Sequence, residues 1–314
     1  MKKYPLVSII LTTYNRRLLL PYAIQSVLSQ TYSNYEIIVV NDFGEDVWDI
    51  IESFKSDKIK YMSHIKNSGL PFARNTALKV SQGDIICYLD DDDLFLENHL
   101  EVLIGTYANY DVDIVYTDAL LVSERIINSK RIIINTQKMF DIPNYTYQQL
   151  QIQNFIPINT ISHKKSILFK TGLFMEELSS LEDWEFLLRL GKNKDFHHIK
   201  CITVEVRRNE DTKNNMLSKE QIKVPEMYKK IYDLHKVNEE QIKAQHSLVI
   251  LRIIKDNING GDFKFNDYAL AMTDQPFDVY QVEDEIDLSL AIKLSKLVDT
   301  KPARKNFLNA IKNL

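Results

Sequence analysis

Four consecutive carboxylates, Asp90 to Asp93, follow the apolar run IICYL within the stretch YLDDDDLF. Crowded carboxylates resist ionising together unless a cation or strong hydrogen-bond donors compensate their charge. In an extended segment Asp90 and Asp92 point to the same side and lie roughly 6.6 Å apart. Such a pair of hard oxygen ligands suits Mg²⁺ or Mn²⁺. The alternative is a solvated turn in which Asp93 caps a helix that starts near Leu94.

Polar residues also close two other strand-like runs. Thr12 and Tyr14 end LVSIILTTY, and Asp42 ends YEIIVVND. Because ligands of open α/β sheets bind at the carboxyl ends of the strands, a parallel sheet would gather these residues beside the Asp90–Asp93 cluster. A ring that stacks on a base, a carboxylate that accepts from a base N–H and a metal on the phosphates together suit a nucleotide. Taken singly, Tyr14 could cap the core and Asp42 could form an Asx turn.

The elements that must position these residues alternate along the first half of the chain. Helix-like spacing of apolar residues separates short, apolar runs that are rich in β-branched residues. These runs predict buried strands at 6–14, 35–42, 58–64, 84–90 and 111–122. The alternation predicts an α/β fold with a mostly parallel central sheet flanked by helices, Rossmann-like in outline.

The later part of the chain is less regular. Residues 123–180 predict loops and short antiparallel pieces, followed by a helix at 182–190 and a strand at 197–206. From about residue 215 the chain is rich in Lys, Glu, Gln, Leu and Ile with few strand signals. We therefore expect a first domain over 1–214 and a helical C-terminal appendage over 215–314.

Composition excludes several classes of protein. A net charge of −4 over 314 residues argues against a general nucleic-acid binder. With eight glycines, the chain contains neither of the common glycine-rich phosphate loops. Cys87 and Cys201 lie far apart, which fits a reducing compartment. No window approaches about 18 apolar residues, so we expect no transmembrane segment and a cytoplasmic protein.

Five segments, taken in order, resemble a known family. They are VSIILTTYNR, AIQSVLSQTYSNYEIIVVND, NSGLPFARNTAL, GDIICYLDDDD and LEDWEFLLRL. Over about residues 5–208 the chain resembles glycosyltransferase family 2, with its GT-A fold. The resemblance implies transfer of a sugar, with inversion, from a nucleotide-sugar donor, usually a UDP-sugar, and a divalent metal, Mn²⁺ or Mg²⁺. It would make residues 1–214 the nucleotide-sugar-binding and catalytic domain.

The resemblance also implies roles for single residues. Thr12 and Tyr14 would flank the base, and Asp42 would bind it. Asp90 and Asp92 would form the metal-binding D-x-D pair, with Asp92 preferred as the direct ligand and Asp91 beside them on the donor. The remaining matches are Arg74 and Asn75, which border the donor site, and Asp183, the catalytic base.

The chemistry of Asp183 can be argued separately. Inverting transfer is one displacement, which needs a general base near the acceptor hydroxyl, and a positioned carboxylate suits that role. The competing interpretation is helix capping, since Ser179 with Glu182 and Ser180 with Asp183 have capping-box spacing.

Other matches to the family are incomplete. No histidine follows near the end of the domain, so Arg207 or Arg208 could contact the diphosphate, or either could be a solvated strand end. His163 has a minor claim to an acceptor-side role, and His197 and His198 are expected to be structural. The Q-x-x-R-W motif of processive membrane synthases is missing, which favours a single addition.

Several rival functions stay open. A phosphatase of the haloacid dehalogenase type also places D-x-D after a strand, and a nucleotidyltransferase would share the metal and nucleotide. A non-catalytic nucleotide-sugar-binding scaffold of a glycan-assembly complex is a further alternative. The acceptor is a glycan, a lipid-linked oligosaccharide or a protein, and bacterial surface polysaccharide or glycoconjugate synthesis is the expected setting. Residues 215–314 could bind the acceptor or a partner, form homo-oligomers, or contact the inner membrane face.

Overall fold

The computed structural model describes residues 5–139, 146–210 and 224–239, together with residues 242, 243, 245, 246, 249, 250 and 253. The chain divides into two compact units. One comprises Met1–Tyr147 and Phe155–Asp211, and the other comprises Gln148–Asn154 and Thr212–Leu314. The central sheet and the candidate site lie in the first unit. The proposed boundary between residues 214 and 215 falls outside the described residues.

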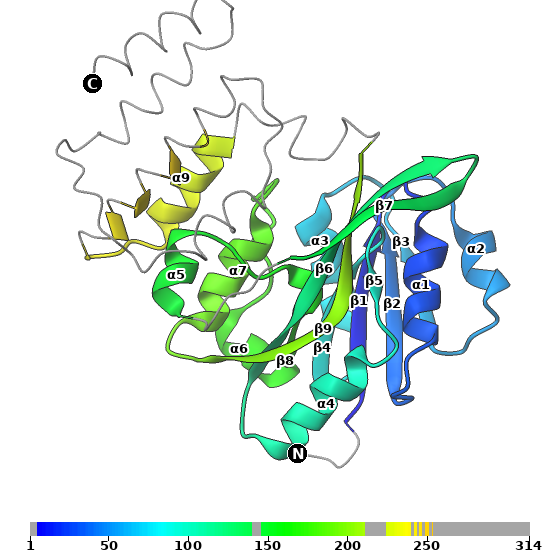
Figure 1. Cartoon of the computed structure of the whole chain (residues 1–314), viewed down its shortest axis with the longest axis horizontal. Helices are drawn as coiled ribbons and strands as arrows, with labels where there is room; N and C mark the ends of the chain where they lie inside the picture. Colours follow the sequence, from blue (N-terminus) through cyan, green and yellow to red (C-terminus); the bar gives the residue numbers. More distant parts are fainter. Residues whose placement is uncertain are drawn as a thin grey trace, which may run out of the picture. The chain divides into compact units, whose positions relative to one another are not determined.

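Four parallel strands form one half of the sheet in the order β3-β2-β1-β4 (Figure 1). They are β1 (Val7–Thr13), β2 (Tyr35–Asn41), β3 (Ile59–Ser63) and β4 (Ile85–Asp90). All residues of β1 and β2 are buried, because helices and neighbouring strands cover these runs on every side. The first four predicted strands are confirmed to within one residue at each end, but β3, at the edge of the sheet, is half-buried and not buried.

The other half of the sheet is mixed. Its core is β8 (Ile161–Lys164), which runs antiparallel between β4 and β6 (Ile114–Ile127). Next comes β9 (Phe196–Asn209), parallel to β6, and then the two-residue β5 (Leu94–Phe95). β7 (Lys130–Lys138) pairs antiparallel with β6 as a hairpin. The antiparallel pieces expected after residue 122 are therefore present.

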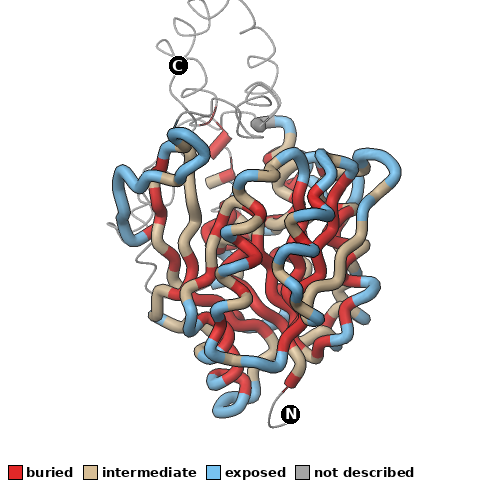
Figure 2. Tube along the Cα trace, turned by 90° about the vertical axis from the view of Figure 1, so that its right-hand side faces the viewer, coloured by how far each residue is buried: buried red, intermediate tan, exposed pale blue. Residues whose placement is uncertain are grey.

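Helices flank the sheet and bury their apolar stripes against it. Figure 2 shows the buried residues gathered along the strands and helix faces, with exposed residues in the connecting loops. The longer helices of the first unit are α1 (Leu20–Leu28), α3 (Leu70–Val80), α4 (His99–Asn109) and α7 (Glu182–Gly191). The short ones are α2 (Trp48–Ser53), α6 (Leu168–Thr171) and the 3₁₀ turns η1 (Ile158–Thr160) and η2 (Lys165–Ile167). The second unit contains α5 (Tyr147–Ile152), apart from its first residue, and α9 (Val224–Leu234).

One helix begins later than the sequence predicts. Residues 94 and 95 form β5, and α4 starts only at His99, so Asp93 is not a helix cap. Instead the backbone N–H of Arg207 donates to Asp93 Oδ1 at 2.6 Å. Pairing of Leu94 with Glu205 then continues the contact with β9.

Most of the helices expected over 215–314 fall outside the described residues. The helix α9 is within them and agrees with this prediction. Within the described parts of the chain, no helix combines the length and the apolar character needed to cross a bilayer.

Candidate active site

The site lies where β1 and β4 end side by side. The register pairs Thr12 of β1 with Asp90 of β4, so the two polar ends are level. Thr12 is buried, whereas the Tyr14 side chain just beyond the strand is 48% exposed. An exposed ring at this edge is free to stack on a planar ligand, which a ring that capped the core could not do.

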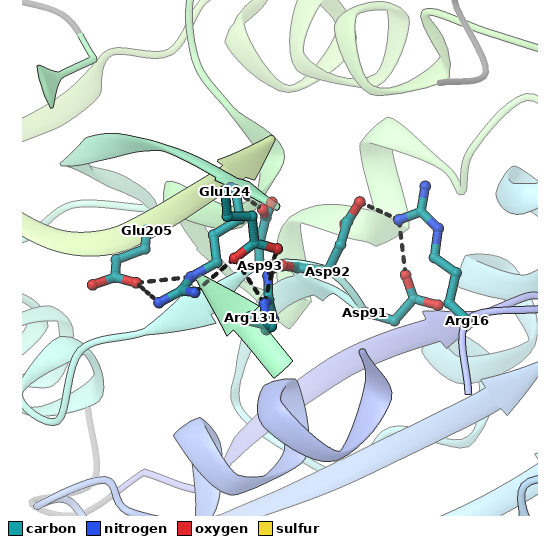
Figure 3. A network of polar contacts seen from close by, with 8 residues as sticks. Arg16, Asp91, Asp92, Asp93, Glu124, Arg131 and Glu205 are labelled. Carbon is teal, nitrogen blue, oxygen red and sulfur yellow. Dashed lines mark hydrogen bonds and ion pairs between the residues drawn. The ribbon is translucent and has the colours of Figure 1, made fainter. Parts of the chain in front are cut away.

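Arg16 holds two of the clustered carboxylates (Figure 3). Its guanidinium bonds to Asp91 Oδ1 at 3.1 Å and forms an ion pair with Asp92. Burial raises the pKa of Asp91 to about 7, although Arg16 pulls it down. The pKa of Asp92 is also raised, by burial and then by Asp90, against the pull of Arg16. Burial and the neighbouring carboxylates thus outweigh the attraction of Arg16 at both positions.

The fourth carboxylate belongs to a different set of contacts, also drawn in Figure 3. Asp93 is buried and accepts hydrogen bonds from the Arg207 backbone and from Asn159. Arg131 donates to both oxygens of the buried Glu124 and to the Asp92 carbonyl oxygen at 2.6 Å. These contacts fix the backbone of the acidic segment and leave the Asp90 and Asp92 side chains partly exposed.

Arg74 joins the acidic segment to α7. Its side chain is 3% exposed and donates to Asp90 Oδ1 at 2.9 Å and to Glu182 Oε1 at 2.6 Å. Asp183 follows on the first turn of α7, half-buried, and its Oδ1 accepts from the Trp184 backbone N–H. Burial raises the pKa of Asp183, and the nearby Arg74 opposes that shift. A general base works best when its pKa lies near the working pH, so a raised pKa suits a carboxylate to this role.

The capping interpretation of this helix start is wrong. Leu181 occupies the N-cap position in a left-handed conformation, with φ 60°, and its side chain makes no cap hydrogen bond. The Glu182 carboxylate accepts a hydrogen bond from the buried Arg74 in place of the expected capping bond. A charge-assisted hydrogen bond of this kind is stronger than a neutral capping bond.

Asp42 is bonded within the chain at both carboxylate oxygens. Oδ1 accepts from His64 Nδ1 at 2.7 Å and from the Ser68 N–H at 2.9 Å, and Oδ2 accepts from the Gly69 N–H at 2.7 Å. This carboxylate therefore anchors the segment that leads into α3. Its expected contact with a base stays a prediction.

Two further candidates, Asn75 and His163, bond to other groups of the chain. The Asn75 amide donates to the Phe174 carbonyl and to Glu176, while the Phe174 N–H donates back to it, all at 2.9 Å. His163 is fully buried and bonds to the Tyr88 hydroxyl at 2.8 Å. Asn75 thus clamps the segment before α7, and His163 belongs to the core under the site.

Sequence reasoning missed Arg16 and Glu182 as members of the site. Arg16 follows β1 in TTYNRR, and a basic residue after a strand that neighbours an acidic strand end is the signal that identifies it. For Glu182 the sequence pattern favours a capping or acceptor-positioning role, because nothing near it in the chain indicates its contact with Arg74.

Known proteins resemble the chain in sequence and fold. The model of Glycosyl transferase family 2 matches residues 8–171. The uncharacterized glycosyltransferase YwdF of Bacillus subtilis (strain 168) is 31% identical over 201 residues, 63% of this chain and 72% of that protein. UDP-Glc:alpha-D-GlcNAc-diphosphoundecaprenol beta-1,3-glucosyltransferase WfgD of Escherichia coli is 30% identical over 198 residues, 62% of this chain and 74% of that protein.

A solved structure shares the fold. S. aureus TarS 1-349, crystallised with UDP, matches with a TM-score of 0.56 at 21% identity, over 76% of this chain and 70% of that one. The fold is GT-A, as expected from the sequence. With the family model matching more than half of its residues, the chain is a glycosyltransferase that belongs to glycosyl transferase family 2.

Proposed function

We propose that this enzyme transfers one sugar, with inversion and with the help of a divalent cation, from a UDP-sugar to a hydroxyl of a glycan-type acceptor. The observation that carries the proposal is Arg74, which ties Asp90 at the end of β4 to the first turn of α7, where Asp183 lies. A donor-side carboxylate cluster and a base are thereby held at one edge of the sheet. A non-catalytic scaffold would not need this link.

Donor binding would use the exposed edge of β1. The Tyr14 ring would stack on the uracil, with Thr12 beside it, and Arg74 and Asp91 would border the sugar diphosphate. Support for a UDP donor comes from relatives: WfgD is named for UDP-Glc, and the TarS structure holds UDP. Asp42 and Asn75 would act chiefly by shaping the loops that close the donor site, given their contacts within the chain.

Asp90 and Asp92 fit a hard divalent cation, Mn²⁺ or Mg²⁺. Both carboxylates keep partly exposed side chains, 30% and 28%, and their oxygens are the donors such ions prefer. No group of three His, Cys, Asp or Glu side chains among the described residues forms a complete metal site. The cation would therefore share these ligands with the donor diphosphate, and it would supply charge stabilisation for the leaving group.

Asp183 would accept the proton of the attacking hydroxyl. It is half-buried on the first turn of α7, and the positive charge of Arg74 opposes the rise in its pKa that burial causes. Glu182 would hold Arg74 in place. Positioned proton transfer of this kind contributes about 10²–10⁴-fold to the rate.

The acceptor is proposed to be lipid-linked, as the name of WfgD states for that relative. Surface polysaccharide or glycoconjugate synthesis in a bacterium, at the cytoplasmic face of the inner membrane, would be the setting. Such an enzyme would be cytoplasmic and peripheral at that membrane.

Calorimetric titration of UDP with Mn²⁺ and then with EDTA tests the donor site. We expect micromolar binding that EDTA abolishes, and that Asp92→Asn weakens at least about tenfold by removing a ligand charge. Asp183→Asn should bind UDP like the parent but lose transfer by about 10²-fold or more. Metal-dependent binding without hydrolysis or transfer from any UDP-sugar would favour the scaffold. Full activity of Asp92→Asn would contradict the metal assignment.

A further inference from the structure

The β6–β7 hairpin exposes a row of large apolar side chains. Ile132, Ile133 and Ile134 are 45%, 54% and 46% exposed, and Ile127 across the turn is 48% exposed. Because successive side chains of a strand point to opposite faces, both faces of β7 are apolar and open. Soluble proteins rarely leave such a patch without a partner.

The hairpin is also basic. Residues 123–138 contain Arg125, Lys130, Arg131 and Lys138 but one acidic residue, Glu124, which is buried and bonded to Arg131. The exposed charges on the hairpin are thus positive, in a chain whose net charge is −4. Two of the cations form ion pairs: Arg125 with Glu210 at 3.8 Å, and Lys138 with Asp118 at 3.3 Å.

The turn end of the hairpin is fixed to the candidate active site, because Arg131 lies in the second residue pair from the β6–β7 turn. Arg131, 4% exposed at its side chain, donates to Glu124 on the facing strand and to the Asp92 carbonyl oxygen. Figure 1 shows the paired β6 and β7 continuing past the middle of the sheet, and Figure 3 shows Arg131 close to the acidic segment. Whatever binds the hairpin is therefore held at a set distance from the donor site.

We propose that the β6–β7 hairpin docks the enzyme on an anionic lipid bilayer. The isoleucines would enter the boundary between headgroups and acyl chains, and Arg125, Lys130 and Lys138 would lie against lipid phosphates. This inference rests on the proposed function in one respect, since a lipid-linked acceptor gives the docking its purpose.

A second copy of the chain fits the hairpin less well. Within the described residues β7 pairs only with β6, so its outer edge could add another strand. If two β7 strands paired antiparallel about Ile134, Lys130 of each copy would face Lys138 of the other. Like charges placed directly opposite destabilise such a pair, and lysines on an edge strand discourage it.

Co-sedimentation of the full chain with lipid vesicles tests the proposal. The vesicles are phosphatidylcholine alone, and phosphatidylcholine mixed with phosphatidylglycerol. We expect binding to the anionic vesicles, lost on adding salt, and at least about tenfold weaker for Ile132→Thr/Ile133→Thr/Ile134→Thr. Threonine keeps the β-branched shape that suits a strand. Ile65→Thr, which alters a loop side chain that is 91% exposed, is the matched control and should bind like the parent.

Two further readouts keep the result unambiguous. Lys130→Gln should weaken binding to the anionic vesicles, and it leaves the isoleucines unchanged. This variant tests the proposal even if the triple variant folds poorly. UDP titration of each variant reports the donor site independently of the vesicles. Equal vesicle binding by the parent and the triple variant would overturn the proposal, as would a parent that ignores both vesicles. So would a parent dimer, seen by light scattering, that the triple variant abolishes.

Discussion

At the scale of single residues, Arg74 is the charge that links the acidic segment after β4 to the first turn of α7. It is buried between Asp90 and Glu182, and Arg74→Gln would leave Glu182 buried without its cation. Because Asp90 is partly exposed, we expect a loss near the lower end of about 3–5 kcal/mol in the free energy of unfolding. Urea denaturation measures it.

The matched variants for this prediction are Arg74→Lys and the double variant Arg74→Gln/Glu182→Gln. Lysine keeps the charge but has no planar fork to reach both carboxylates, so its loss should be intermediate. The double variant should lose less than the sum of the two single variants. Additive losses would show that the contact with Glu182 contributes nothing.

Asp42 distinguishes an anchoring role from base recognition. Asp42→Asn replaces an acceptor oxygen by an NH₂ group that faces the Ser68 and Gly69 N–H donors. We expect about 1–3 kcal/mol lower stability, because a buried donor loses its acceptor. The exposed Asp57, changed to Asn, is the control and should leave the melting temperature unchanged. Unchanged stability with weaker UDP binding would assign Asp42 to the base instead.

At the scale of elements, the turn after β2 sits against the segment that follows β1. A Cβ on Gly44 would lie 2.6 Å from the Asn15 backbone nitrogen, between Tyr14 and Arg16. We expect Gly44→Ala to cost about 1–3 kcal/mol and to weaken UDP binding, since backbone must move. Gly105→Ala, exposed inside α4 with nothing near its Cβ, should instead gain about 0.5–1 kcal/mol. Thermal melts and calorimetry of the pair compare the two; equal effects would contradict the steric argument.

The elements also separate what the sequence predicts from what it cannot. The strands β1, β2 and β4 are apolar runs whose burial follows from composition, whereas β3 is only half-buried. The carboxyl ends of β1, β2 and β4 carry the candidate site residues that the motifs indicate. The short β5 was missed because its partner, β9, lies more than a hundred residues away. For the same reason the pattern at 179–183 indicated caps, while the fold brings Arg74 to Glu182 across a separation of 108 residues. Spacing along the chain predicts hydrogen bonds between near neighbours. A buried charge pair between distant residues, such as Arg74 and Glu182, replaces them.

At the scale of the whole molecule, buried histidines set a limit on stability in acid. His163 and His99 are fully buried, and burial lowers the pKa of His163 to about 4 and that of His99 to about 3. At these two histidines the unfolded chain binds more protons than the folded one between pH 6.5 and those values, so their contribution to stability falls as pH falls. For His163 the full loss is roughly 3 kcal/mol. Asp91, whose pKa burial raises to about 7, acts with the opposite sign in the same window.

His163→Gln isolates one contribution from this opposed set. The Gln amide can still meet the Tyr88 hydroxyl, but it does not titrate. At pH 8 the parent should be the more stable of the two, because the imidazole fills its place in the core and bonds at both nitrogens. As pH falls from 7 to 4 the difference should shrink by up to roughly 3 kcal/mol, since only the parent carries the cost of a histidine that cannot take up a proton. Urea denaturation of both proteins across this range measures the difference, and Asp91 cancels from it. A constant difference would mean that the His163 ring is protonated as readily in the folded chain as in the unfolded one.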